Sequence, residues 1–231
     1  MTGLTPEEAT ALMLSLRVAG VAVLVSLPVG LAVAMVLARG RWPGLWLLNA
    51  LVHLPLILPP VVTGYFLLLA FGRKGPVGAF LEQAFGLVFA FRWTGAALAA
   101  AVMGFPLMVR AMRLAIEAVD PKLEEAASTL GASRLAVFRS VTLPLILPGV
   151  IAGAVLAFAK AMGEFGATIT FVSNIPGQTQ TLPSAIYTAL QVPGGDTTAG
   201  RLALISVIVA VSAVLLSEFI ARRVAARIRG A

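Results

Sequence analysis

The chain consists of long apolar segments separated by short polar ones. A helix that crosses a membrane needs about 20 mostly apolar residues. No linker or fixed repeat divides the sequence, so residues 1–231 are expected to form one domain. The pattern predicts an all-α integral membrane protein with five spanning helices, at residues 12–37, 45–71, 94–114, 145–165 and 202–220.

A shorter apolar segment, residues 75–91, lies between the second and third predicted spans and carries Glu82. Its length and its acidic residue favour an interfacial or re-entrant helix. A sixth spanning helix is the alternative.

Composition supports a membrane protein and argues against several other classes. The chain is 59% hydrophobic and 12% charged, with a mean hydropathy of +0.98, whereas soluble domains are about 25% charged. The net charge is +7, but the basic residues flank apolar spans, so nucleic-acid binding is not expected. Cysteine is absent, which excludes disulfides, thiol catalysis and cysteine-ligated metal; no metal site is expected. The first ten residues lack a positive charge, so the first span is interpreted as a retained helix.

The distribution of basic residues predicts the orientation, because short cytoplasmic loops are rich in Lys and Arg. The richer set comprises Arg39, Arg41, the basic residues from Arg110 to Arg139, Arg222, Arg223, Arg227 and Arg229. The poorer set comprises Arg73, Lys74, Arg92 and Arg201. With five spans, the N-terminus is therefore expected outside and the C-terminus in the cytoplasm. Residues 115–142 become the main cytoplasmic loop and residues 166–200 an outer loop. The end of the chain, residues 222–231, is interpreted as an anchor near anionic lipid, with a contact to a partner protein as the alternative.

The cytoplasmic loop contains the signals of a short helix. Asp120 is a good N-cap and Pro121 suits the first helical position, which predicts a helix over 121–130 that Gly131 ends in a left-handed conformation. Ser133 is expected to cap a second short helix that stops before Pro144. The spacing places one apolar face on the first helix, made by Leu123, Ala126, Ala127 and Leu130.

Prolines interrupt the second predicted span. Each of Pro55, Pro59 and Pro60 removes a backbone N–H. Broken backbone at membrane depth is tolerated only inside protein or beside a water-filled cavity, and the N-terminus of a half-helix there would favour an anion. A kink used only for packing is the alternative. The single histidine, His53, is expected to bond to the backbone.

Lys160 and Glu164 stand four residues apart near the outer end of the fourth span. Charges at such depth are costly unless paired, so the two side chains are expected to pair with each other. Either they form part of an outer gate or they form a structural ion pair. A carboxylate would repel an anion, so Glu164 is not expected to bind one directly.

The cytoplasmic loop resembles a family signature. Glu125-Ala126-Ala127, then Gly131, Val141 and Leu143-Pro144 follow the spacing of the cytoplasmic loop in ABC importer permeases, where a hydrophobic residue, usually Ile, stands at the position of Val141. Residues 53–65, 105–120 and 163–188 resemble molybdate permeases of this superfamily. The resemblance implies the type I ABC importer permease fold. It also implies a loop over 115–142 that couples to an ATPase through Glu124, Glu125, Ala126, Ala127, Gly131, Ala132, Leu143 and Pro144.

The same resemblance implies a pathway for an oxyanion. The residues expected to line the pathway or its gate are Pro59, Pro60, Thr63, Gly64, Gly163, Glu164, Gly166, Thr168, Thr170, Ser173 and Asn174. Among them, Thr63 can offer a hydroxyl and Gly64 close backbone approach. The hydroxyl and amide groups of residues 168–174 are the expected transient hydrogen-bonding partners of the oxyanion.

The resemblance further implies the partners. They are a second copy of this chain, two cytoplasmic ATPase subunits that bind ATP and Mg, an extracytoplasmic molybdate-binding protein, and the inner-membrane bilayer of a prokaryote. The sequence has no G-x-x-x-x-G-K-[ST] loop, so we expect no cofactor in this chain and no enzymatic activity of its own. The expected function is molybdate import by alternating access. The alternatives are tungstate, sulfate or thiosulfate as substrate, or an ion-coupled secondary transporter. An intramembrane enzyme lacks a convincing set of catalytic residues.

Overall fold

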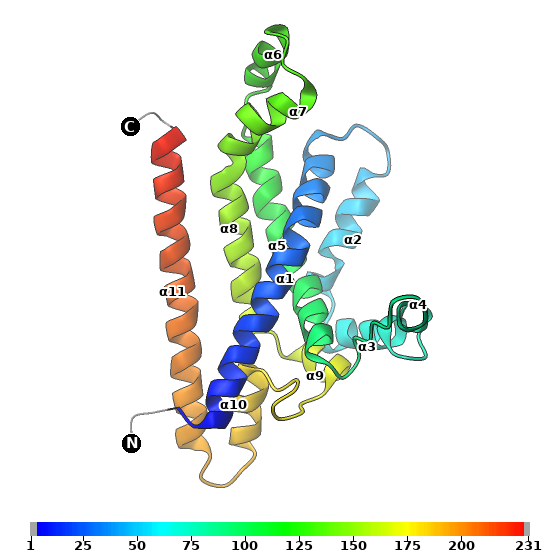
Figure 1. Cartoon of the computed structure of the whole chain (residues 1–231), viewed down its shortest axis with the longest axis vertical. Coiled ribbons are helices and arrows are strands. Elements are labelled where there is room, and N and C mark those ends of the chain that lie inside the picture. Colours follow the sequence, from blue (N-terminus) through cyan, green and yellow to red (C-terminus); the bar gives the residue numbers. More distant parts are fainter. Residues whose placement is uncertain (1–3, 229–231) are drawn as a thin grey trace.

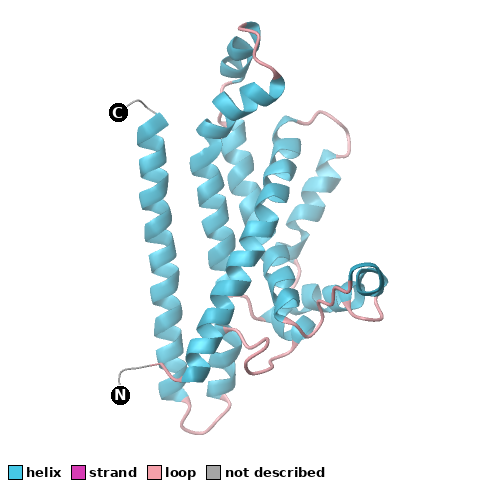
Figure 2. Cartoon of the chain, viewed as in Figure 1, coloured by secondary structure: helices cyan, strands magenta, loops and turns pink. Residues whose placement is uncertain are grey.

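The computed structural model describes residues 4–228, except for the side chains of residues 217, 221, 222 and 224–228. Every regular element in that part of the chain is a helix (Figures 1 and 2). The helices are α1 (Pro6–Arg39), α2 (Leu45–Ile57), α3 (Pro60–Phe71), α4 (Pro76–Phe85), α5 (Trp93–Glu117), α6 (Pro121–Thr129), α7 (Arg134–Val137), the π-turn η1 (Phe138–Thr142), α8 (Leu143–Met162), α9 (Gly166–Val172), α10 (Leu182–Leu190) and α11 (Asp196–Ile228).

Among the described residues, four helical segments are long and apolar enough to cross a membrane: α1, α5, Arg134–Met162, and α11 as far as Ile220. The predicted span over 45–71 is not one straight helix, because α2 and α3 meet at an angle of 115°. The count is five if this bent pair is a single broken span. The first, third and last spans fall within longer helices than predicted, and the fourth ends at Met162 instead of residue 165.

Short helices occupy the segments between the spans. The segment 75–91 forms α4, which has only 10 residues and is too short to cross a membrane, so the sixth-span alternative is wrong. The predicted outer loop over 166–200 is not simply a loop, since it contains α9, α10 and the start of α11. In Figure 1, α3 and α4 project sideways from the long helices, near α9.

The long helices α1, α5 and α8 pack closely because small residues line their contacts. A Cβ placed on Gly104 of α5 would lie 3.1 Å from the carbonyl oxygen of Ala157 in α8. A Cβ on Gly153 of α8 would lie 2.9 Å from the carbonyl oxygen of Met108. Ala96 and Ala99 of α5 are fully buried. Interfaces rich in small residues are typical of membrane helices, since lipid supplies no hydrophobic force between them.

The two ends of the molecule carry different elements (Figure 1). One end holds α6, α7, the connection between α1 and α2, and the C-terminal end of α11; the other holds the start of α1, α10 and the start of α11. At the second end, Arg201 of α11 donates to Glu8 of α1, with 3.0 Å between Nε and Oε1. The elements of the more basic set of loops therefore share one end. The anchor predicted for residues 222–231 lies almost wholly outside the described side chains.

Candidate functional site

The helix α6 has the caps that the sequence predicts. Asp120 accepts a hydrogen bond from the N–H of Lys122, at 3.0 Å. At the other end the N–H of Gly131 donates to Ser128 and the N–H of Ala132 to Ala127, the two bonds of a Schellman motif. Gly131 has φ +86°, and nothing lies within 4 Å of a Cβ placed there. The left-handed backbone conformation thus favours glycine at this position, and the predicted helix over 121–130 is confirmed to within one residue.

One surface of α6 is apolar and open. Leu123 is 49% exposed and Leu130 is 89% exposed. Ala126 and Glu125 are also exposed, and Ala127 is half-buried. We call this surface, made by Leu123, Ala126 and Leu130, the α6 face. Large apolar side chains gathered on a short helix outside the packed bundle are typical of a protein interaction site.

Glu124 behaves differently from its neighbour Glu125. Its Oε1 accepts a hydrogen bond from the hydroxyl of Thr142 at 2.7 Å and another from the guanidinium of Arg39 at 3.4 Å. The same guanidinium nitrogen donates to the carbonyl oxygen of Ile116, also at 3.4 Å. Glu124 therefore joins α6 to η1 and α1 within the chain. Both glutamates were expected among the residues that couple to an ATPase, and nothing in the sequence indicates that Glu124 faces inward.

The connection from α7 to α8 differs from the prediction that the second short helix stops before Pro144. Ser133 caps α7 as expected, accepting from the N–H of Ala136 at 3.3 Å. The helix does not stop before Pro144, because α7, η1 and α8 follow one another without a gap. The N–H of Leu143 donates to the carbonyl of Phe138, five residues back, and such a π-turn accommodates a proline that would disrupt a regular α-helix. Leu143 and Pro144 thus link α6 and α7 to a spanning helix.

We expect Thr142→Val to loosen α6 without unfolding the chain. Thr142 is 2% exposed, and valine keeps its volume while removing one hydrogen bond to the carboxylate of Glu124, a loss of about 2 kcal/mol. Faster hydrogen exchange confined to α6 and η1 would confirm this result. Thr129→Val is the matched control, since among the described residues the Thr129 hydroxyl donates only to the local carbonyl of Ala126. Equal exchange in both variants would contradict the expectation.

The break in the second predicted span lies where the prolines predict it. The helix α2 ends at Ile57, and α3 begins at Pro60 with Pro59 as its N-cap residue. The N–H groups of Val62 and Thr63 already donate to the carbonyl of Pro59, at 2.9 and 3.2 Å. The break and a helix that begins at Pro60 are therefore confirmed, whereas the first turn of that helix has few free donors for an anion.

The glycines near this break are explained by contact between α3 and α9. A Cβ on Gly64 would lie 2.5 Å from the carbonyl oxygen of Ala167, and a Cβ on Gly166 would lie 2.7 Å from Cβ of Pro60. Between them Thr63 is buried, and its hydroxyl has no hydrogen-bond partner in the described part of the chain. Close packing of the two short helices accounts for both glycines.

Gly64→Ala is expected to push α3 away from α9. The added methyl would meet backbone atoms of Ala167, which cannot rotate aside, so the cost should be about 1–3 kcal/mol. Gly20→Ala in α1 is the matched control, because nothing lies within 4 Å of a Cβ there. A lower thermal unfolding temperature for Gly64→Ala alone is the predicted result; equal temperatures for the two variants would contradict it.

Glu164 is buried, and each of its two carboxylate oxygens has a partner. Its side chain is 1% exposed and lies 2.8 Å from the ammonium of Lys160, so the predicted ion pair is confirmed. The other carboxylate oxygen accepts from the N–H of Ala167 at 2.9 Å. Gly163, the C-cap of α8, and Phe165 lie between these contacts. The carboxylate thus fixes the turn that joins α8 to α9.

The polar residues of this region are partly engaged with their own chain. The hydroxyl of Thr170 donates to the carbonyl of Gly166, at 2.9 Å. The amide of Asn174 donates to Thr188 at 2.7 Å, while its Oδ1 is buried without a partner in the described residues. Thr168 is buried, and Ser173 has φ +65°. Their role as transient partners of an oxyanion remains a prediction.

His53 makes the expected backbone contact. Its Nδ1 lies 2.8 Å from the carbonyl oxygen of Asn49. That carbonyl belongs to the turn before His53 and is not the one that Pro55 leaves free, which belongs to Leu51.

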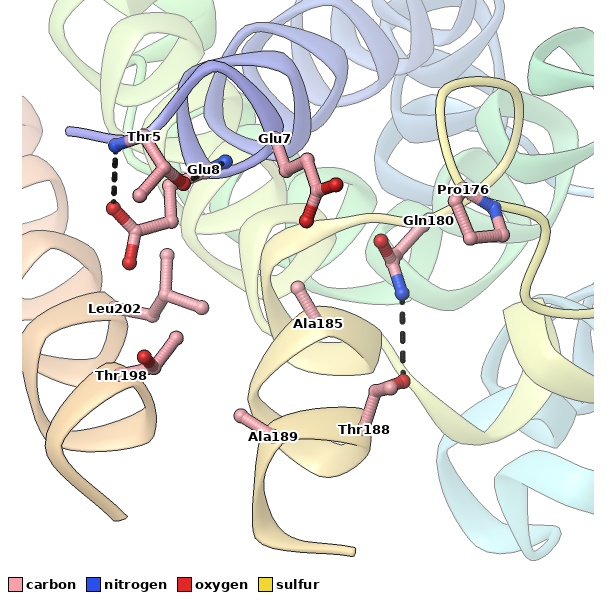
Figure 3. A pocket seen from close by; sticks show the side chains of 10 residues that line it. All are labelled: Thr5, Glu7, Glu8, Pro176, Gln180, Ala185, Thr188, Ala189, Thr198 and Leu202. Carbon is pink, nitrogen blue, oxygen red and sulfur yellow. Dashed lines mark hydrogen bonds between the residues drawn. The ribbon is translucent and has the colours of Figure 1, made fainter. Parts of the chain in front are cut away.

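A cavity of about 360 Å³ lies between α1, α10 and α11 at the N-terminal end of the molecule (Figure 3). Its lining includes Glu7, Glu8, Gln180 and Thr188. Figure 3 shows Glu7 and Gln180 pointing into the space beside α10. Its carboxylates disfavour an anion. The sequence did not reveal this cavity, because its walls come from segments more than a hundred residues apart.

Comparisons with known proteins give a consistent result. A family model described as "Binding-protein-dependent transport system inner membrane component" matches residues 26–230. The molybdenum transport system permease protein ModB of Escherichia coli (strain K12) is 59% identical over 219 residues, covering 95% of this chain and 96% of that protein. The sulfate transport system permease protein CysT of Salmonella typhimurium is 40% identical over 186 residues, covering 80% of this chain and 67% of that protein.

A solved structure resembles the whole fold. The crystal structure of a bacterial ABC transporter involved in the import of the acidic polysaccharide alginate matches with a TM-score of 0.75 and 19% identity. The match covers 95% of this chain and 80% of that chain. At this identity the likeness shows a shared fold.

Proposed function

Because this chain belongs to the family of binding-protein-dependent transport system inner membrane components, we propose that it is the membrane-spanning subunit of an ATP-driven molybdate importer. The expected type I ABC importer permease fold is confirmed by the all-helical structure and by the alginate transporter's fold. The chain is thus a multi-pass transport subunit of the inner membrane and not an enzyme.

The main support for molybdate as the substrate is the 59% identity to a molybdenum permease over almost the entire chain. The sulfate permease is less similar, at 40% over a shorter stretch. Sulfate therefore remains the second candidate. Tungstate is a tetrahedral dianion of similar size, and we expect it to share the route.

The proposed assembly contains two copies of this chain, two cytoplasmic ATPase subunits and an extracytoplasmic binding protein that delivers the oxyanion. ATP and Mg would bind the ATPase subunits. The end of the molecule with α6 and α7 would face the cytoplasm, which leaves the N-terminus outside. The open α6 face supports this arrangement, since Leu123 and Leu130 are poorly suited to contact with water.

Coupling would pass from α6 to the membrane along two connections. The first is the unbroken run through Leu143 and Pro144 into α8. The second is Glu124, which ties α6 to Thr142 and Arg39. ATP can favour one of two membrane conformations only through contacts with α6 that differ between them. In this proposal the outward-open state binds the loaded binding protein, and the inward-open state follows hydrolysis.

The outer gate would lie where α3 meets α9. Pro59, Pro60, Thr63 and Gly64 contribute one side, and residues 163–174 contribute the other. The unpartnered hydroxyl of Thr63 supports the proposal, because a buried polar group without a partner is costly unless it finds one in another state.

Uptake of labelled molybdate by the complete transporter in proteoliposomes tests the substrate. We expect unlabelled tungstate to compete strongly and sulfate weakly. If sulfate competes as well as molybdate, or if only sulfate is accumulated, the assignment to molybdate is wrong while the transporter class stands.

A further inference from the structure

A second polar cluster lies away from the gate, between α2 and α5. It surrounds a cavity of about 340 Å³. The cavity is large enough for a small tetrahedral anion and several waters, since one water occupies about 30 Å³ in the liquid. The residues that line it are Asn49, His53, Arg110, Arg113, Leu114 and Glu117.

The two arginines of this cavity differ in their partners. The Nε of Arg113 donates to Glu117 at 2.7 Å, and another guanidinium nitrogen donates to Oδ1 of Asn49 at 3.2 Å. Arg113 is thus held in place. Arg110 is exposed, and within the described part of the chain its guanidinium makes no ion pair and no hydrogen bond. His53 uses Nδ1–H for the carbonyl of Asn49, which leaves its Nε2 as the other polar atom of the ring.

The position of Arg110 makes a free guanidinium unusual. It lies seven residues before the end of α5, or about 10 Å along the axis, and Leu114 beside it is 60% exposed. Ionisable residues inside membrane spans usually face a water-filled cavity or the bundle interior and mark ion pathways. A planar guanidinium with five donors matches the oxygens of a tetrahedral anion.

We propose that the α2–α5 cavity is a transit site for the transported oxyanion. In this site Arg110 binds the anion, and Arg113 holds α5 against Asn49 of α2. This inference rests on the proposed function, because it takes its ligand class from it. The site lies towards the end that carries α6, so it would hold the oxyanion just before its release into the cytoplasm.

The charges of the cavity suit release as well as binding. Glu117 neutralises Arg113, so the two arginines and the glutamate together have a net charge of +1 (two positive charges and one negative) against a dianion. Conduction requires a site that attracts an ion but does not retain it. A second unpaired arginine would hold the oxyanion more tightly and slow its release.

Uptake of labelled molybdate by the complete transporter tests the role of Arg110. We expect Arg110→Gln to lower the uptake rate about tenfold, the equivalent of one lost charge-assisted contact. Arg110→Lys should give an intermediate uptake rate, because lysine keeps the positive charge but lacks the paired, planar N–H donors of the guanidinium. Arg92→Gln is the matched control: it removes one exposed positive charge from the other end of α5. Equal uptake by Arg110→Gln and Arg92→Gln would overturn the proposal.

A binding measurement separates this inference from the proposed function. The chain has no cysteine, so Leu114→Cys places a single thiol in the cavity wall. In the complete transporter, molybdate should slow its reaction with the uncharged reagent N-ethylmaleimide, measured on this chain after the subunits are separated. The protection should disappear when Arg110→Gln is added. Leu204→Cys, on an exposed part of α11, should be unaffected by molybdate.

The outcomes distinguish the possible occupants. Protection by sulfate and not by molybdate would support the site and contradict the proposed substrate. Protection that survives Arg110→Gln would overturn the site and leave the proposed function intact. Labelling that slows only when the vesicles contain phosphatidylglycerol, whatever oxyanion is added, would overturn the proposal in favour of a lipid headgroup phosphate.

Discussion

Replacing Gly131 with proline is expected to abolish the stimulation of ATP hydrolysis by loaded binding protein in the assembled transporter. Gly131 has φ +86°, whereas proline is restricted to φ near −65°. Proline also lacks the N–H that donates to Ser128 in the Schellman motif. The end of α6 could not form, and the α6 face would lose its position relative to α8.

Two companion variants sharpen this prediction. Gly131→Asn should retain most of the stimulation, because asparagine tolerates the left-handed conformation and open space surrounds the position. Glu125→Ala should reduce stimulation, since Glu125 is exposed on α6 and belongs to the proposed coupling set. If stimulation survives both Gly131→Pro and Glu125→Ala, α6 is not the coupling element.

The second large effect is expected at Glu164. Replacing it with alanine leaves the ammonium of Lys160 without its partner and the N–H of Ala167 without its acceptor. Breaking a buried ion pair costs about 3–5 kcal/mol. The lower end applies here, because Lys160 keeps 29% of its side chain exposed. A clear fall in the thermal unfolding temperature of the solubilised complex is the predicted result.

A second substitution, at Lys160, identifies the cause. Glu164→Gln retains a side-chain acceptor for Ala167 and removes only the charge, so it should cost less than Glu164→Ala. Adding Lys160→Met to Glu164→Gln should recover stability, since no unpaired charge remains. If Glu164→Gln and the double variant are equally unstable, the ion pair does not explain the burial of Glu164.

The sequence predicts local features of this fold well. Apolar length identifies the spanning helices, and Asp120, Pro121 and Gly131 place the ends of α6, because caps and turns depend on residues close in the chain. It also predicts the break at Pro59 and Pro60. It could not predict the 115° bend there, since the packing of Gly64 against Ala167 sets the direction of α3.

The features that the sequence missed depend on contacts between distant residues. Pro144 indicates a helix end, but the π-turn before it lets the helix continue. Glu124 and Glu125 look equivalent in the sequence, and only contacts with Arg39 and Thr142 distinguish them. The cavity between α2 and α5 likewise joins residues some 60 positions apart, Asn49 and Arg113 among them.

ATP-driven accumulation of labelled molybdate tests the proposed function most directly. Proteoliposomes should contain this chain with its ATPase subunits, and loaded binding protein should be present on the extracytoplasmic side of the permease. No ion gradient should be applied. We expect uptake that requires both ATP and the binding protein and that fails when this chain is reconstituted alone. Accumulation by this chain alone, driven by an ion gradient without ATP, would contradict the proposed function.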